Sequence, residues 1–378
     1  MSRHLAWFFL AVLLLAVSAP LQALNYEVGG CKTGSSYVNF TTISAAVIGV
    51  PAGSKIQICP GVYPEQVTIT QPLTLQGIAF NNASRAAITA NADGAFAPNV
   101  SGLFGDFYAQ VLVQNVNPPG PVNIIGITVD GAGINFACDG SEFLAGIFYA
   151  SGTAGTVNGV TARNNQSSGC GYGVWAENAA GLNQSIVIEN SSVHEGGVVT
   201  LTDQNPPTLA ATIKGNFLTS SNQTYIEGYF EGITVAGVNG SVTGNVTTGG
   251  YSGITAGNGV YGGGGGTVTI SQNTIADLQY AIFLVNSIGI ISSNKIWNAQ
   301  WPFTFAPYTT YPDGPTTIKG NTAMNSLEAV FFGTCPANLT LQGNIFNDAQ
   351  VAFYRAPSVI TGNALYSVDT IQAGSSCN

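Results

Sequence analysis

Charged side chains are scarce in this sequence: Asp, Glu, Lys and Arg together make up only 7% of its 378 residues. Basic residues are the scarcer kind, with nine Lys and Arg against eighteen Asp and Glu, and one of the nine is Arg3. A surface so poor in cations cannot neutralise a row of phosphates, which argues against nucleic acid as a partner. Helical domains depend on Glu, Lys, Leu and Ala, so this composition also disfavours a helical fold.

Long apolar runs are missing after residue 23. The first 23 residues combine a basic start at Arg3, the apolar run Leu5–Val17 and small residues up to Ala23. This pattern predicts a secretory signal peptide that is cleaved after Ala23. The run is short for a bilayer-spanning helix, so we expect a mature chain without a membrane span. We expect it to be secreted, or to lie in the periplasm or cell envelope, as a monomer.

Histidine is nearly absent, because His194 is the only one beyond the predicted signal peptide, and no Cys-x-x-Cys pair occurs. All six cysteines follow Ala23, and an even number in an exported chain favours disulfides over a metal site. Several connectivities are possible, and proximity in the sequence favours three pairs: Cys31–Cys59, Cys138–Cys170 and Cys335–Cys377. We predict no metal and no cofactor.

Glycine is abundant, at 48 residues, and one short phrase recurs: an aliphatic residue, any residue, a small or polar residue, then Asn. The phrase ends at Asn216, Asn245, Asn273, Asn294, Asn321, Asn344 and Asn363. Asn190 begins the series in a shortened form, and Gly126 and Gly159 are assigned the same place in two earlier coils. Units of similar but variable length predict a solenoid whose loops differ from coil to coil.

Asparagine suits the corner of each coil for a physical reason. It tolerates left-handed backbone angles, and its amide can bond to the Asn one coil away, so that stacked amides form a ladder. Each corner is followed by a short apolar strand that opens with Gly, Ala or Pro, such as Gly253-Ile254-Thr255 or Ala281-Ile282-Phe283. We predict an all-β fold: a single-stranded right-handed parallel β-helix of about ten coils with a short N-terminal cap helix.

The cap helix is predicted within Phe40–Val50, where apolar residues have helical spacing and Thr41 or Thr42 can act as the N-cap. A cap is needed because the first coil would otherwise present an open sheet edge. The expected organisation is a signal peptide at 1–23, the cap and first coil at 24–77, and the β-helix at 78–378, which forms one domain with the cap.

Several motifs of the entry segment Phe40–Gly77 carry a family resemblance. They are Phe40-Thr41-Thr42-Ile43-Ser44-Ala45-Ala46, Pro51-Ala52-Gly53, Ile56–Ile58, Gly61-Val62-Tyr63-Pro64-Glu65 and Leu73-Thr74-Leu75-Gln76-Gly77. The chain resembles the pectin lyase-like superfamily of right-handed β-helix repeat proteins, with no pectinase signature. The Gly-x-x-Asp-Phe-x-x-Gly of pectin methylesterases, the Gly-His-Gly of polygalacturonases and the Asp cluster of pectate lyases are missing. The resemblance therefore implies the fold and none of those activities.

One candidate catalytic set comes from aligning the coils. Four residues beyond each corner lie Asp130, Arg163, His194, Ser220, Gly249, Asp277, Asn298, Asn325, Asp348 and Ser367. If the alignment holds, Asp130, Arg163 and His194 stack on three consecutive coils, where they could hold a carboxylated sugar and move a proton. The alternative, which we favour, is a polar turn column with a satisfied salt bridge.

A second candidate is a row of outward-facing aromatic residues that would bind sugar rings. The row consists of Phe148, Trp175, Phe283, Phe331 and Tyr354. Aromatic faces suit the apolar C–H face of a sugar, and Glu177 beside Trp175 could act as a general acid because an apolar neighbour raises a carboxyl pKa. The alternative is that loops cover this face and make the aromatics a minor core.

These features predict an exported β-helix that binds a polysaccharide, and whether it also cleaves or modifies that polysaccharide stays open. An enzyme of this kind would resemble a polysaccharide lyase or a glycoside hydrolase. The alternative is a non-enzymatic structural or surface-display protein of the cell envelope. A row of aromatics open to solvent beside a carboxylate would favour the first function, and a featureless face of Thr, Ser and Asn the second.

Overall fold

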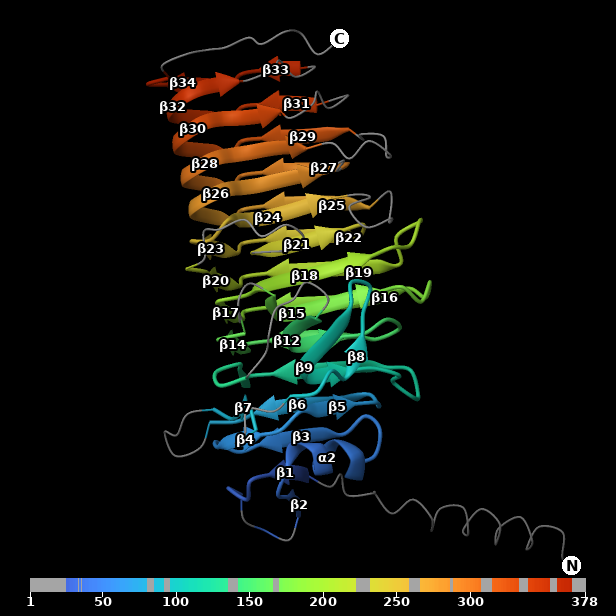
Figure 1. Ribbon diagram of the computed structural model, residues 1–378. Coiled ribbons are helices and arrows are strands. Elements are labelled where there is room, and N and C mark those ends of the chain that lie inside the picture. The colour runs from blue at the N-terminus through green and yellow to red at the C-terminus, as the bar shows by residue number, and fades with distance from the viewer. Residues whose placement is uncertain are drawn as a thin grey trace, which may run out of the picture.

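The computed structural model shows one tall stack of coils, with the N-terminal coils at one end and the C-terminal coils at the other (Figure 1). It describes residues 25–32, 34, 36–79, 85–91, 96–134, 142–165, 170–221, 232–257, 266–285, 288–306, 315–332, 339–353 and 359–368. The predicted signal peptide lies outside the described residues. The stack is a right-handed parallel β-helix, as predicted from the recurring asparagines.

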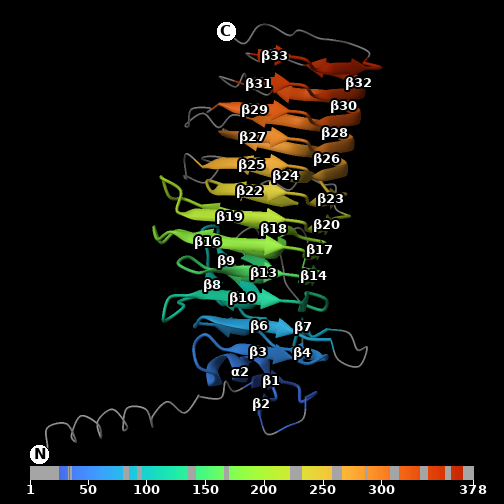
Figure 2. The same ribbon diagram turned by 180° about the vertical axis from the view of Figure 1, so that it is seen from behind.

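Two long sheets run the length of the stack. Sheet A, which faces the viewer in Figure 2, has fourteen strands, all paired in parallel. In spatial order they are β2 (Tyr37–Phe40), β1 (Asn25–Val28), β3 (Lys55–Ile58), β6 (Leu73–Gly77), β10 (Pro121–Ile125), β13 (Ala154–Asn158), β16 (Gln184–Glu189), β19 (Leu209–Lys214), β22 (Asn239–Thr243), β25 (Thr267–Ser271), β27 (Ile288–Ser292), β29 (Thr316–Lys319), β31 (Leu339–Gln342) and β33 (Val359–Thr361).

Sheet B has twenty strands and supplies the other two sides of each coil. The short strands that follow the corner after each sheet A strand are β4 (Val62–Pro64), β7 (Ala87–Thr89), β11 (Thr128–Asp130), β14 (Thr161–Arg163), β17 (Ser192–His194), β20 (Phe217–Thr219), β23 (Val246–Thr248) and β34 (Ala364–Tyr366). The third side is formed by β5 (Val67–Ile69), β9 (Asp106–Val113), β12 (Glu142–Tyr149), β15 (Gly171–Asn178), β18 (Gly197–Thr202), β21 (Ile233–Ala236) and β24 (Ser252–Gly257), and β8 (Val100–Ser101) pairs antiparallel with β9.

In the C-terminal coils the second and third sides merge into single bent strands. These are β26 (Thr274–Val285), β28 (Lys295–Ala306), β30 (Thr322–Phe332) and β32 (Ile345–Phe353), drawn as continuous curved ribbons in Figure 1. Each strand bends where one residue adopts a positive φ, for example 60° at Asp277 and 53° at Asn298. Because no loop separates the two sides here, the outer corner of these coils is built from the bend residues themselves.

The interior of the stack is one continuous apolar core. Along sheet A the burial alternates, as in β6, where Leu73 and Leu75 are buried and Thr74 is not. Alternation follows from the two-residue period of a strand, which sends every second side chain inward. Each fully buried Ile or Val stabilises the fold by roughly 1.5–3 kcal/mol, so stacked coils supply the core that a single coil lacks.

The predicted asparagine ladder is present, and its amides are buried from Asn216 to Asn344. In each of the seven steps that start at Ser191, Asn216, Asn245, Asn273, Asn294, Asn321 and Asn344, the backbone N–H donates to the Asn Oδ1 one coil further on, at 2.9–3.0 Å. From Asn216 to Asn344, each side-chain amide also donates to the next Oδ1 and to a carbonyl of the preceding coil.

The start of the ladder was predicted one residue too early. Strand register pairs Glu189 with Lys214, which aligns Ser191, and not Asn190, with Asn216. Asn190 instead shares the left-handed backbone of Gly159 and Gly215, with φ angles of 51°, 61° and 63°. The Ser191 hydroxyl occupies the ladder position and accepts from the N–H of Val160 at 3.1 Å. Gly126 and Gly159 therefore precede the ladder position, which in their coils is held by an apolar residue.

The N-terminal end of the core is covered by α2 (Ile43–Gly49), which lies within the predicted range. Thr42 is the N-cap and accepts from the N–H of Ala45 at 3.1 Å. The carboxylate of Glu65 also caps this end, because it accepts from the N–H groups of Ile43 and Ser44 at 2.8 and 2.9 Å. In the described part of the chain, no helix has the length and apolar character needed to cross a bilayer.

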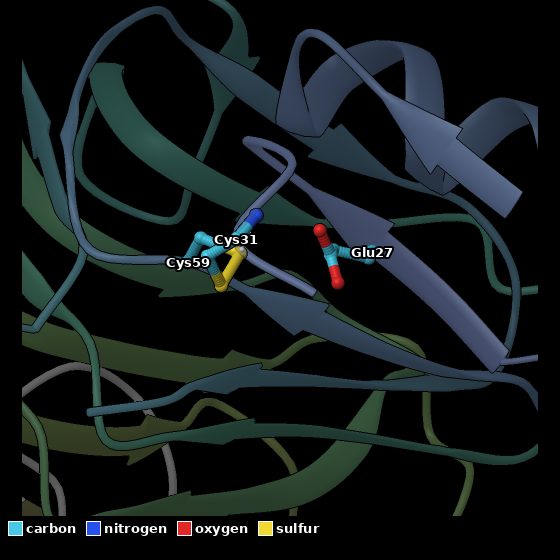
Figure 3. A group of neighbouring side chains, drawn as sticks. All are labelled: Glu27, Cys31 and Cys59. Carbon is cyan, nitrogen blue, oxygen red and sulfur yellow. Dashed lines mark hydrogen bonds between the residues drawn. A yellow bond between two sulfur atoms is a disulfide. The ribbon is translucent and has the colours of Figure 1, made fainter. Parts of the chain in front are cut away.

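The disulfide Cys31–Cys59 is present and joins the end of β1 to the end of β3, as predicted (Figure 3). The buried carboxylate of Glu27 lies beside it and accepts from the N–H of Lys32 at 3.0 Å. The side chains of Glu27, Cys31 and Cys59 lie close enough together to hold a metal ion. Both sulfur atoms belong to the disulfide, however, so neither is available as a thiolate ligand.

The other predicted disulfides are only partly visible. Cys170 is buried and disulfide-bonded. Cys138, its predicted partner, lies outside the described residues, as do Cys335 and Cys377.

Candidate functional site

The predicted row of Asp130, Arg163 and His194 is present on three consecutive coils. Strand register pairs Asp130 with Arg163 and Arg163 with His194. The next member of the row is Thr219, and not Ser220 as predicted, because the ladder register differs by one residue at Asn190. His194 Nδ1 lies 2.9 Å from the Thr219 hydroxyl.

The contacts within this row favour a structural ion pair. Arg163 Nε donates to Asp130 Oδ2 at 2.7 Å, and Asp130 Oδ1 accepts from Asn164 at 2.8 Å and from the Ala132 N–H at 3.0 Å. Burial pushes the pKa of Asp130 upward, but these hydrogen bonds and the Arg163 guanidinium together hold it below its usual range. A carboxylate that is already saturated with donors is poorly placed to move a proton, so the structure agrees with the salt-bridge alternative.

The predicted aromatic row is in register but is not an exposed platform. Phe148 pairs with Trp175, and Phe283 follows in the same row after Val199, Thr234 and Thr255. Phe148 and Trp175 face away from the solenoid interior, yet they are 0% and 1% exposed. The prediction that these two bind sugar is therefore wrong, and the minor-core alternative holds for them. The side chain of Phe331 and all of Tyr354 lie outside the described residues.

A second apolar core surrounds Trp175 outside the solenoid. The Trp175 ring lies 4.8 Å from the rings of both Phe107 and Tyr172 and 5.8 Å from that of Phe104. Phe104 lies in the turn between β8 and β9, so this hairpin covers the outer face of β12 and β15. The cover explains why an outward position holds a buried indole.

Glu177 fastens the hairpin to the second core. Its Oε2 accepts from the N–H of Leu103 and from Trp175 Nε1, both at 3.1 Å, and the residue is 4% exposed. Burial raises the pKa of Glu177, the two hydrogen bonds act in the opposite direction, and the nearby charge of Asp203 raises the pKa further. The pKa of Glu177 is raised as predicted, but its carboxyl is buried, and its two hydrogen bonds hold the β8–β9 hairpin in place.

The raised pKa of Glu177 predicts a pH-dependent stability. A carboxyl with a higher pKa in the folded than in the unfolded state stabilises the fold below the unfolded pKa, and this contribution is lost as pH rises through the folded pKa. Glu177→Gln keeps an acceptor oxygen and removes the charge. We expect the stability of the variant relative to wild type to increase from pH 4 upward, measured by urea unfolding across a pH series (about pH 4–9). A constant difference across the series would contradict this assignment.

A partly exposed aromatic stack lies elsewhere, on the C-terminal coils. The rings of Tyr280 and Trp301 lie 4.6 Å apart with an interplanar angle of 25°, and Tyr251 packs on Tyr280 at 5.0 Å. Phe283, a member of the predicted row, contacts Tyr280 edge-on at 5.5 Å. All four side chains are half-buried, so one edge of the stack is accessible.

A carboxylate continues this stack. Glu328 occupies the position on β30 that Trp301 occupies on β28, because Phe303 pairs with Val330 two residues further along. Burial raises the pKa of Glu328, and the neighbouring Trp301 indole acts in the opposite direction. We use the name C-terminal face for Tyr251, Tyr280, Trp301 and Glu328 together with the groove described next.

The groove lies at the bends of β26 and β28. It has a volume of about 560 Å³ and is lined by Asp277, Leu278, Gln279, Asn298 and Gln300. Asn325 Nδ2 donates to Asn298 Oδ1, and Asn298 Nδ2 donates to Asp277 Oδ1, both at 2.9 Å. This second, exposed ladder was predicted as part of the Asp130 column, but it forms a separate column at the bends.

The sequence contained a signal for this face that the prediction did not use. Tyr280, Trp301 and Glu328 each stand directly before the Ala or Pro that opens the predicted strand. The predicted strands began at that Ala or Pro, so the residue before it was not considered. The bend at Asp277 interrupts the alternation, so that Gln279 and Tyr280 are both partly exposed, and a two-residue period does not place Tyr280.

Comparison with protein families gives one partial match. Residues 222–374 match a family model described as "Periplasmic copper-binding protein (NosD)". The matched segment has no His, and its only Cys and Met are Cys335 and Met324. Copper sites draw on several imidazole and sulfur ligands, so this composition does not fit a copper centre. No curated protein matches the chain significantly.

Two solved structures illustrate the shared fold. A family 28 exopolygalacturonase from Yersinia enterocolitica is 12% identical, with a TM-score of 0.55, over 88% of this chain and 73% of its own. The tailspike protein of Escherichia coli bacteriophage HK620 is 13% identical, with a TM-score of 0.57, over 83% of this chain and 60% of its own. At these identities the likeness concerns the fold alone.

Proposed function

We propose that this chain is an exported β-helix protein that binds a polysaccharide along the C-terminal face. The observation that carries the proposal is the half-buried stack of Tyr251, Tyr280 and Trp301, which stands beside a groove lined with amides. Aromatic faces pack against the apolar faces of sugar rings, while amides and carboxylates bind the hydroxyl groups.

The geometry of a solenoid suits a chain-like ligand. Tyr280 and Trp301 are paired in register on adjacent coils, and neighbouring strands lie about 4.8 Å apart. The bend residues repeat at the same spacing along β26, β28, β30 and β32. A ligand lying along the stack would therefore meet an aromatic ring on the coils of Tyr251, Tyr280 and Trp301, and a bend residue on each of the four coils from β26 to β32.

Three further observations support export. The predicted signal peptide and the disulfide Cys31–Cys59 both fit an oxidising compartment outside the cytosol. The family model that matches part of the chain is also described as periplasmic.

The fold comparison supports the choice of ligand. One structural neighbour is an exopolygalacturonase, a name that refers to a polysaccharide.

A glycan array with matched tryptophan variants tests the proposal. We expect the mature protein to bind at least one glycan, and Trp301→Ala to weaken that binding by about 2 kcal/mol, or roughly thirtyfold. Trp297→Ala is the control, because Trp297 is also half-buried and on β28 but precedes the bend at Asn298. The proposal fails if no glycan binds or if Trp301→Ala binds like wild type. A complete lack of binding would favour the structural, surface-display alternative.

A further inference from the structure

We infer that the C-terminal face selects neutral glycans and discriminates against polyuronates. This inference rests on the proposed function and adds the class of ligand. The class of ligand is inferred from the charge of the groove, because a shared β-helix fold does not determine which ligand a protein binds.

The charged side chains at this face are acidic. Asp277 lines the groove, Glu328 follows Trp301, and Asp348 occupies the bend of β32. Asp277 and Asp348 are exposed, and the second oxygen of Asp277 has no partner among the described residues. The groove would therefore meet a ligand with uncompensated negative charge.

No cation lines the groove within the described part of the chain. The nearest basic residue along β28 is Lys295, which precedes the bend residue Asn298 by three positions. At about 3.3 Å per residue this places its backbone roughly 10 Å away along the strand. A polyuronate carries a carboxylate on every sugar, so several like charges would face Asp277 and Glu328 without a partner. Such an arrangement is repulsive.

The remaining polar groups match hydroxyls. Gln279, Gln300 and Asn298 present amides, which donate and accept, and the carboxylates accept from O–H donors. Tyr280 and Trp301 offer apolar ring faces beside them. A neutral sugar satisfies both sets of groups, because it has hydroxyls at its edge and C–H groups on its faces.

Titration calorimetry with two classes of hexasaccharide tests the inference on the mature protein. The neutral probes are cello-, manno- and xylohexaose, and the acidic probes are hexagalacturonate and hexamannuronate, each at low and at high salt. We expect the best neutral probe to bind at least about tenfold more tightly than either acidic probe at low salt, with a smaller ratio at high salt because salt screens the repulsion.

The double variant Asp277→Asn and Glu328→Gln removes two charges and keeps the shapes, and Asn tolerates the positive φ at position 277. We expect the ratio of neutral to acidic affinity to fall at least about threefold in this variant. Acidic probes that bind wild type as tightly as neutral ones, with loss in Trp301→Ala, would overturn the inference and leave the binding function intact. A failure of both classes to bind would overturn the proposed function as well.

Discussion

Replacing Asn294 with Ala is expected to destabilise the solenoid by roughly 3–5 kcal/mol. The Asn294 side chain is 1% exposed, and its Oδ1 accepts from the backbone and side-chain N–H groups of Asn273 at 2.9 Å. Its Nδ2 donates to the carbonyl of Ile270 and to Oδ1 of Asn321. Alanine removes the acceptor of two buried N–H donors of Asn273 and one donor each to Ile270 and Asn321, although Asn321 Oδ1 keeps the backbone N–H of position 294. Each buried group left without a hydrogen bond costs about 1–3 kcal/mol before the structure relaxes.

Asn298→Gly is the matched control for this prediction. Asn298 lies four residues later on the same coil, joins a ladder of its own, and is exposed, so that water can replace its partners. Glycine also tolerates its φ of 53°. We expect a change within about 0.5 kcal/mol. The measurement is the urea unfolding midpoint together with hydrogen exchange of β25 to β29, where loss of the ladder acts first. Similar losses in the two variants would show that the buried ladder has no special role.

Replacing Trp175 with Ala is expected to cost about 3–5 kcal/mol and to release the hairpin of β8 and β9. The indole is 1% exposed and fills the second core between Phe107, Tyr172 and Phe104. Its Nε1 also donates to Glu177, which holds the N–H of Leu103. The variant therefore loses apolar packing and one of the two contacts that position the hairpin anchor.

Limited proteolysis separates these two effects. We expect cleavage near the turn between Ser101 and Asp106 to be faster in Trp175→Ala than in wild type, under conditions where both proteins remain folded by circular dichroism. Trp297→Ala is the control, because this indole is half-buried and lies outside the second core. Unchanged cleavage in Trp175→Ala would mean that the hairpin is held by contacts other than those of Trp175 and Glu177.

The positions of the candidate residues show which inferences the sequence supported. The stacking of Asp130, Arg163 and His194 followed correctly from counting residues beyond each corner, because their three coils share the same glycine-type bend. The same count failed from Thr219 onward, because Asn190 resembles a ladder residue in type but occupies the glycine position. Residue identity alone cannot distinguish an Asn chosen for its left-handed backbone from one chosen for its amide.

The sequence by itself determined the architecture of this protein. Recurring asparagines, alternating apolar residues and a capped helix near the first cysteine specify a parallel β-helix, since each is a local requirement of backbone geometry and burial. Only the tertiary structure decided which outward residues are accessible. A hairpin more than seventy residues upstream buries Trp175, while a strand bend leaves Trp301 half-exposed beside a groove. Exposure depends on what other segments cover, and this is a property of packing between distant parts of the chain that local pattern does not contain.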